Sequence, residues 1–222
     1  MTQTSVVSEE RRLGIRELLA FIGMALGMFL AVLNIQIVGS SFDQIKAGLA
    51  AGSEEVSWVL TSALMAEVIM IPMSGWLCRL MSTRWLFTGC LLGFGLASIG
   101  CALATSIEQM IIFRAAQGFM GGGLAPMIWA AIYVSFPRRY QNYLLAIVSL
   151  LGTSAVALGP SLGGWISEEM SWPWLFYFSV PFAALSAAMV FFFVDFDMPD
   201  WSIFEDIDVL GILLMATFFM CL

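Results

Sequence analysis

Four polar or charged side chains lie inside otherwise apolar stretches of the sequence. Glu67 falls in the middle of ALMAEVIMIP, and Asn34 lies in the outer third of the first apolar run. Arg114 and Gln117 stand three residues apart in RAAQGF, a spacing that places them on one side of a helix. An acid within a membrane costs about 2–3 kcal/mol to insert, so it normally faces the protein interior and has a function. A buried acid whose proton affinity changes with conformation is what proton coupling requires.

Each of these residues also has a purely structural interpretation. Glu67 would be a protonated acid of the core or a partner in a helix contact, and Arg114 would extend its guanidinium to the outer interface. Asn34 and Gln117 would form simple hydrogen bonds between helices. The residues alone leave these alternatives open. We take all four as candidates for proton coupling and substrate contact.

The elements that must hold these side chains are membrane spans. Of the 222 residues, 60% are hydrophobic and 11% are charged, which is outside the range of a soluble domain. Continuous apolar runs of about 20 residues predict transmembrane helices and not the alternating strands of a barrel. We predict an all-α polytopic membrane helix bundle. Its six spans lie near 18–38, 56–77, 85–104, 110–135, 142–166 and 174–194.

The remaining segments are polar or incomplete. Residues 1–17 are predicted to be a polar cytoplasmic tail, 18–194 the six-span bundle, and 195–206 an acidic cytoplasmic linker. A seventh span is expected over 207–222, where about 16 residues stand in place of the roughly 20 that a span needs. We therefore expect this chain to be a truncated product or a fragment.

Basic residues predict the orientation, because loops rich in Lys and Arg stay in the cytoplasm. Seven of the nine basic residues fall on one side of the predicted bundle. This side also carries the N-terminus, so we expect a multi-pass protein of the cell inner membrane with a cytoplasmic N-terminus. The seven are Arg11, Arg12, Arg16, Arg79, Arg84, Arg138 and Arg139.

Two predicted spans contain faces of small residues together with a proline. Small residues let helix backbones approach closely where lipid gives no hydrophobic drive to associate, and proline adds a bend. Such faces indicate helices that shift against a neighbour, with static close packing as the alternative. The face of the fourth span consists of Ala115, Gly118, Gly122 and Ala125, and Pro126 follows it. The face of the fifth span consists of Gly152, Ala155, Gly159 and Gly163, and Pro160 and Gly164 belong to the same motif.

Enzymatic and metal chemistry have little support in this sequence. It contains no histidine, and its four cysteines form no CxxC pair, so we interpret them as small apolar residues. No serine nucleophile stands with a base partner. We expect no enzyme, no metal, no cofactor and no nucleic-acid partner.

Several ordered motifs resemble the major facilitator superfamily, and most closely its fourteen-span drug:proton antiporters of the EmrB type. GTSAVALGPSLGG is similar to the antiporter motif of span 5, and RAAQG to the span 4 motif RxxQG. SGWLCRLMSTR resembles the loop motif between spans 2 and 3, here carried by Gly75, Arg79 and Arg84. LNIQIV, SWPWLFYFSVP and DVLG are similar to parts of spans 1, 6 and 7. The resemblance covers roughly residues 20 to 215.

The resemblance implies the N-terminal six-helix half of a transporter that the proton gradient drives. It implies that Arg114 tunes the coupling acid and that the span 5 motif shapes the outward gate. Two positions depart from the family pattern. Asn34 replaces the span 1 acid and does not titrate, so Glu67 becomes the candidate for that role. Arg79 replaces the usual Asp of the loop motif, which removes the gating contact of that acid.

The function expected from these residues is proton-coupled export of amphipathic organic compounds, for which the missing C-terminal half is needed. The negative charge available at Glu67 and the substrates usual for this family favour cationic compounds. Relatives in Gram-negative bacteria often pair with a periplasmic adaptor and an outer-membrane channel, and the sequence shows no docking site for either. Two alternatives stay open: a transporter of one specific metabolite, and a membrane module without transport activity.

Overall fold

A computed structural model describes residues 14–195 and residue 217 of the chain. Within these residues the chain forms helices and contains no strand. Six of the described helical segments are long and apolar enough to cross a membrane. The all-α membrane bundle is therefore confirmed. The predicted linker and seventh span lie outside the described residues, apart from Asp195 and Thr217.

Three of the six spans are single helices in the first half of the bundle. Span 1 is α1 (Ile15–Ser40), span 2 is α3 (Ser53–Met81) and span 3 is α4 (Thr83–Ala102). A short helix, α2 (Phe42–Leu49), connects the first two spans. The sequence analysis did not predict α2, and it placed the start of span 1 at residue 18, whereas α1 begins at Ile15.

The other three spans differ in their continuity. Span 4 consists of α5 (Ile107–Gly122) and α6 (Leu124–Ser135), whereas span 5 is the single helix α7 (Arg138–Glu169). Span 6 consists of the short α8 (Trp174–Tyr177) and of α9 (Ser179–Phe193).

Both interruptions lie four residues before a proline. Pro126 removes the helical hydrogen bond to the carbonyl of Gly122, and α5 ends at Gly122. Pro181 likewise removes the helical hydrogen bond to the carbonyl of Tyr177, which is the last residue of α8. In span 4 the run Gly121–Gly123 adds weak helix formers at the same place. The predicted fourth span is therefore confirmed as one apolar stretch, Ile107–Ser135, and its helix is interrupted before Pro126, where the sequence predicted a bend.

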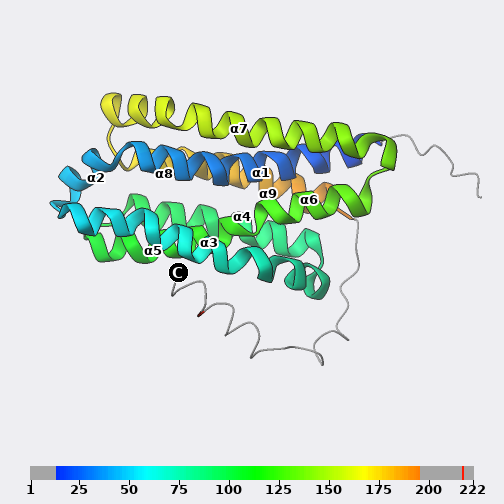
Figure 1. The fold of residues 1–222 in the computed structure, drawn as a ribbon, viewed down its shortest axis with the longest axis horizontal. Helices are drawn as coiled ribbons and strands as arrows, with labels where there is room; N and C mark the ends of the chain where they lie inside the picture. Colours follow the sequence, from blue (N-terminus) through cyan, green and yellow to red (C-terminus); the bar gives the residue numbers. More distant parts are fainter. Residues whose placement is uncertain (1–13, 196–216, 218–222) are drawn as a thin grey trace, which may run out of the picture.

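The bundle consists of two groups of three spans that lie side by side (Figure 1). In one group, α1 packs between α7 and α9. In the other group, α5 packs between α3 and α4. The contact of α4 with α9 joins the groups, and α1 touches α5 over a short length only. The short interface between α1 and α5 is where the polar residues meet.

Candidate functional site

Arg114 is the centre of a buried polar cluster. Its side chain is 1% exposed and is the largest fully buried side chain among the described residues. Nη1 donates hydrogen bonds to Oδ1 of Asn34 at 2.7 Å and to the side-chain oxygen of Gln117, and Nε donates to the carbonyl oxygen of Val59 at 3.4 Å. The guanidinium also lies 5.8 Å from the ring centroid of Phe176. One side chain of α5 thus contacts α1, α3 and α8.

Gln117 extends this cluster to the remaining neighbours. Its Nε2 donates to Oγ of Ser98 on α4 at 2.6 Å, and Oγ of Ser179 on α9 donates to the same serine oxygen at 3.2 Å. Because buried polar groups need partners, each bond holds one helix against another. The cluster therefore links both groups of spans through side chains.

The alternative in which Arg114 extends to the outer interface is wrong, because the guanidinium is buried and hydrogen-bonded inside the bundle. Within residues 14–195, Arg114 forms no salt bridge with a carboxylate. Its Nη2 and the Nδ2 of Asn34 donate to no described residue. The cluster consequently carries a positive charge and two donors available to an acceptor.

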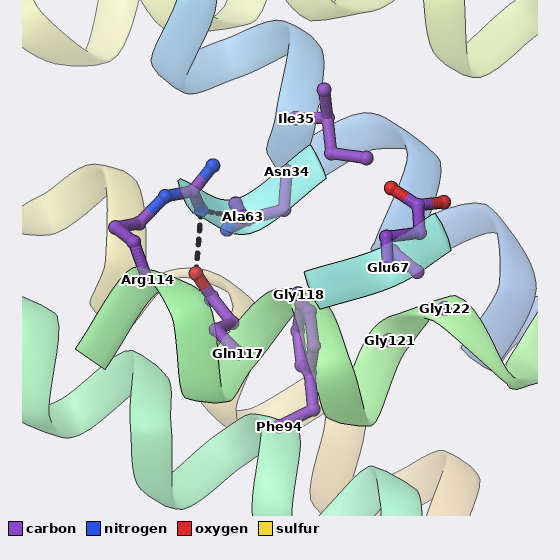
Figure 2. Close-up of a pocket in the computed structure, with 11 residues that line it drawn as sticks. Asn34, Ile35, Ala63, Glu67, Phe94, Arg114, Gln117, Gly118, Gly121 and Gly122 are labelled. Atoms are coloured by element: carbon purple, nitrogen blue, oxygen red, sulfur yellow. Dashed lines mark hydrogen bonds between the residues drawn. The ribbon is translucent and has the colours of Figure 1, made fainter. Parts of the chain in front are cut away.

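Glu67 lies beside this cluster and not within it. A small pocket is lined by Asn34 and Ile35 of α1, by Ala63 and Glu67 of α3, by Phe94 of α4, and by Arg114, Gln117 and three glycines of α5. Figure 2 shows Arg114 and Gln117 at one end of it and the Glu67 carboxylate at the other. The pocket holds about 10 Å³, which is room for one water-sized group. Glu67 is half-buried, whereas Arg114 is fully buried.

Two glycines of α5 fix the position of Glu67 relative to the cluster. A Cβ added at Gly118 would lie 2.7 Å from the Cα of Ala63, and one added at Gly122 would lie 2.6 Å from the carbonyl oxygen of Glu67. Both helices contribute positions four residues apart, so the backbones touch over a full turn. The small face predicted for span 4 therefore holds the turn of α3 that carries Glu67.

The predicted residues of span 5 fall into two sets. A Cβ at Gly159 would overlap the side chain of Gln36, and one at Gly163 would lie 2.7 Å from the carbonyl oxygen of Ile37, both on α1. A Cβ added at Gly152 would meet only the side chain of Met28, at ordinary van der Waals distance. Gly164 has open space around it, and Pro160 is exposed within the unbroken α7. The close contact predicted for this motif thus involves two of its glycines, and its gating role stays a prediction.

The loop motif lies at the far end of α3 from Ser53. Gly75 and Arg79 are exposed and line a second hollow, between α3 and α6. Arg84 is on α4, and its guanidinium lies 4.7 Å from the ring centroid of Phe191. None of these residues lines the pocket beside Arg114, and the loss of the gating contact at Arg79 stays a prediction.

Sequence reasoning found Asn34, Arg114 and Gln117 but missed the two serines that complete the cluster. Ser98 lies in the apolar run GLASIGC, where a lone hydroxyl is a weak signal that often bonds its own backbone. Ser179 stands at the start of α9, beyond an interruption that was not predicted. The described residues contain no group of His, Cys, Asp or Glu that would hold a metal ion.

The fold and the cluster define a class of protein: a multi-pass helical membrane protein with a buried polar centre between two groups of three spans. The pattern of the Major Facilitator Superfamily matches residues 24–205. The chain belongs to this superfamily. Its family and fold are those of transporters and not of enzymes.

Curated relatives place the chain near the EmrB type, as its motifs predicted. The colistin resistance protein EmrB of Acinetobacter baumannii is 37% identical over 198 residues, which is 89% of this chain and 39% of that protein. The fatty acid resistance protein FarB of Neisseria gonorrhoeae is 33% identical over 76% of this chain and 34% of that protein. The multidrug export protein EmrB of Escherichia coli is 32% identical over 72% of this chain and 31% of that protein. The chain therefore spans between about a third and two-fifths of the curated relatives it matches.

Solved structures agree on the fold. A D-xylose-proton symporter gives a TM-score of 0.68 at 13% identity and covers 90% of this chain and 52% of that one. A bacterial homolog of the human lysosomal transporter Spinster, in an inward-facing and unoccupied conformation, gives 0.65 at 16% identity, over 85% of this chain and 45% of that one. At these identities the likeness concerns the architecture alone.

Proposed function

We propose that this chain is the N-terminal half of an inner-membrane exporter that exchanges amphipathic organic compounds for protons. The single observation that carries the proposal is the pocket in which a half-buried acid, Glu67, stands beside a buried and unneutralised cation, Arg114. The names of the similar proteins, which include multidrug export and colistin resistance, support export as the direction.

The mechanism uses two environments for the Glu67 carboxyl. The neutral acid is favoured when lipid or an apolar compound surrounds it, and the carboxylate is favoured when it approaches the guanidinium of Arg114. The two donors that lack a described partner, Nη2 of Arg114 and Nδ2 of Asn34, are available to donate hydrogen bonds to that carboxylate. A proton taken up from the outer side would then leave on the inner side, and a cationic compound would compete with it for Glu67.

The test is export by a full-length version of the protein in inverted membrane vesicles. An imposed pH gradient should drive accumulation of an amphipathic cationic dye, and an ionophore that dissipates the gradient should release it. Accumulation that follows the membrane potential and ignores the pH gradient would contradict proton exchange. Accumulation of one metabolite only would favour the alternative of a specific transporter.

The proposed orientation places the N-terminus and the ends of the bundle near Arg79 and Arg139 in the cytoplasm, because basic residues gather there. We expect a cysteine introduced at Ala51, which follows α2, to react with an impermeant thiol reagent from outside intact cells. A cysteine introduced at Arg139 should react only after permeabilisation. Labelling is measured in a background whose native cysteines are replaced. The reverse pattern would contradict both the orientation and the proposed direction of transport.

The proposed partners are the exported compound, membrane lipid and the C-terminal half that the family fold requires. A periplasmic adaptor and an outer-membrane channel are further proposed partners. The alternative without transport activity predicts no gradient-driven accumulation from any longer version of the chain.

A further inference from the structure

The guanidinium of Arg114 is a buried cation whose described hydrogen-bond partners are all neutral. Nη1 donates to the side-chain oxygens of Asn34 and Gln117, and Nε donates to the carbonyl oxygen of Val59. Buried charges in proteins are normally paired with an opposite charge, because an unpaired charge is costly in a medium of low dielectric constant. These neutral acceptors satisfy hydrogen bonds but leave the positive charge of Arg114 unbalanced.

Two donors of this cluster lack a described acceptor. Nη2 of Arg114 and Nδ2 of Asn34 are buried and donate to no described residue. The hydrogen bond between Nη1 and Oδ1, at 2.7 Å, keeps these donors near each other, because each belongs to the same planar group as one of the bonded atoms. Both side chains line the small pocket, and they are 1% and 3% exposed. Helices of the described residues enclose them, so the site does not depend on any further chain.

In this conformation the carboxylate of Glu67 does not balance the charge of Arg114. It lies at the opposite end of the pocket, as Figure 2 shows, and forms no salt bridge with Arg114. The glycines of α5 hold the backbone of α3 there, since a Cβ added at Gly122 would lie 2.6 Å from the carbonyl oxygen of Glu67. Among the described residues, the other titratable side chain whose charge would act on Arg114 is Cys101 of α4. A thiol carries no charge at neutral pH.

The chemistry of this site selects a small anion. Two N–H donors beside an unbalanced cation favour a negatively charged acceptor, because charge-assisted hydrogen bonds are about twice as strong as neutral ones. A water molecule would accept both bonds but would leave the charge unbalanced. The pocket holds about 10 Å³, which suits a single atom and excludes a phosphate, a sulfate or an organic acid.

We propose that the cluster around Arg114 binds one monatomic anion, chloride or another halide, through Nη2 of Arg114 and Nδ2 of Asn34. In the proposed exchange the carboxylate of Glu67 competes for the same donors, so the anion is held while Glu67 is protonated. This competition rests on the proposed function, whereas the site itself needs no transport activity and would exist in a chain that transports nothing.

The test measures the melting temperature of the purified 222-residue chain in detergent at mildly acidic pH, as sodium chloride replaces sodium gluconate at constant ionic strength. A ligand that binds only the folded state raises this temperature as its concentration rises. For a dissociation constant of about 10 mM, we expect a rise of about 3–6 °C at about 0.15 M chloride. Bromide should act as chloride does. The width of the chloride NMR line, which exchange with the protein broadens, measures binding directly.

Three variants isolate the site. Asn34→Asp keeps the shape of the side chain and places a carboxylate where Oδ1 already accepts a hydrogen bond from Arg114, so it should lose the dependence on chloride and melt in gluconate at least as high as the parent does in chloride. Asn142→Asp is the matched control, because it adds the same charge at an exposed position of α7 outside the pocket, and it should keep the dependence. Glu67→Gln removes the competing carboxylate and should show a rise at least as large as that of the parent. A monodisperse elution profile checks the fold of each variant.

Three results would overturn the proposal. A melting temperature that ignores chloride in both the parent and Glu67→Gln would show that these donors bind no halide. A rise in Glu67→Gln alone would show that the carboxylate of Glu67 balances Arg114 in the parent, a result that contradicts the anion site and supports the proposed function. A rise that Asn34→Asp keeps would mean that chloride binds elsewhere on the protein.

Discussion

A full-length protein with Glu67→Gln should lose all export driven by a pH gradient, down to the level of vesicles without the protein, and should still bind its substrate. Glutamine keeps the shape and hydrogen bonding of the acid but cannot take up and release a proton. Because Asn34 also cannot titrate, no other described residue of the pocket replaces this step. Dye accumulation and equilibrium binding, measured on the same vesicles, separate coupling from recognition.

Two variants act as controls for Glu67. Glu67→Asp should keep partial export with a shifted pH profile, since the acid remains but sits one methylene further back. Glu54→Gln removes an exposed acid from the first turn of the same helix and should export as the parent does. If Glu67→Gln exports as well as the parent between about pH 6 and 8, the coupling acid lies elsewhere and Glu67 is structural or selects substrate.

Gly159→Leu should abolish export in a full-length protein while membrane insertion stays largely intact. Even a Cβ at this position would overlap the side chain of Gln36, so leucine wedges α7 away from α1. The neighbouring turn of α1 carries Asn34, the partner of Arg114, so the displacement also reaches the buried cluster. Insertion is measured by the thiol labelling described above and export by dye accumulation.

Gly164→Leu is the matched control on the same helix. The space around Gly164 is open, so the same side chain should cause no overlap and export should persist. Unchanged export in Gly159→Leu at normal expression would mean that the contact of α7 with α1 is static packing that tolerates a shift, and that the gate lies elsewhere.

Periodicity and charge predicted the number and type of the spans, but not where two of them break. Four prolines lie within the described spans. Each removes the helical hydrogen bond to the carbonyl four residues before it, so the sequence alone does not distinguish the four positions. Pro72 and Pro160 remain inside continuous helices, whereas Pro126 and Pro181 coincide with interruptions. Neighbouring helices determine whether the freed carbonyl is tolerated without a break, and that information is tertiary.

The same division between local and tertiary information applies to the site. The spacing of Arg114 and Gln117 was enough to place them on one side of a helix, and they are hydrogen-bonded. Asn34 precedes Arg114 by 80 positions, so only the assembled bundle joins them. Glu67 and Arg114 share a pocket, yet they form no salt bridge, because α3 places the acid at the opposite end of that pocket.

The buried position of Arg114 also has a consequence for how the protein enters the membrane during synthesis. Span 4 is the least apolar of the six described spans. An arginine costs at most about 2.5–3.5 kcal/mol to insert, the value for the centre of a helix, and Arg114 lies about two turns from the start of span 4. Hydrogen bonds to charged groups contribute about 1.5–3 kcal/mol each. Asn34 and Val59, which accept bonds from Arg114, both precede it in the chain and leave the ribosome first. Both acceptors are therefore already made when span 4 enters the bilayer, and their bonds to Arg114 offset the cost of inserting its charge.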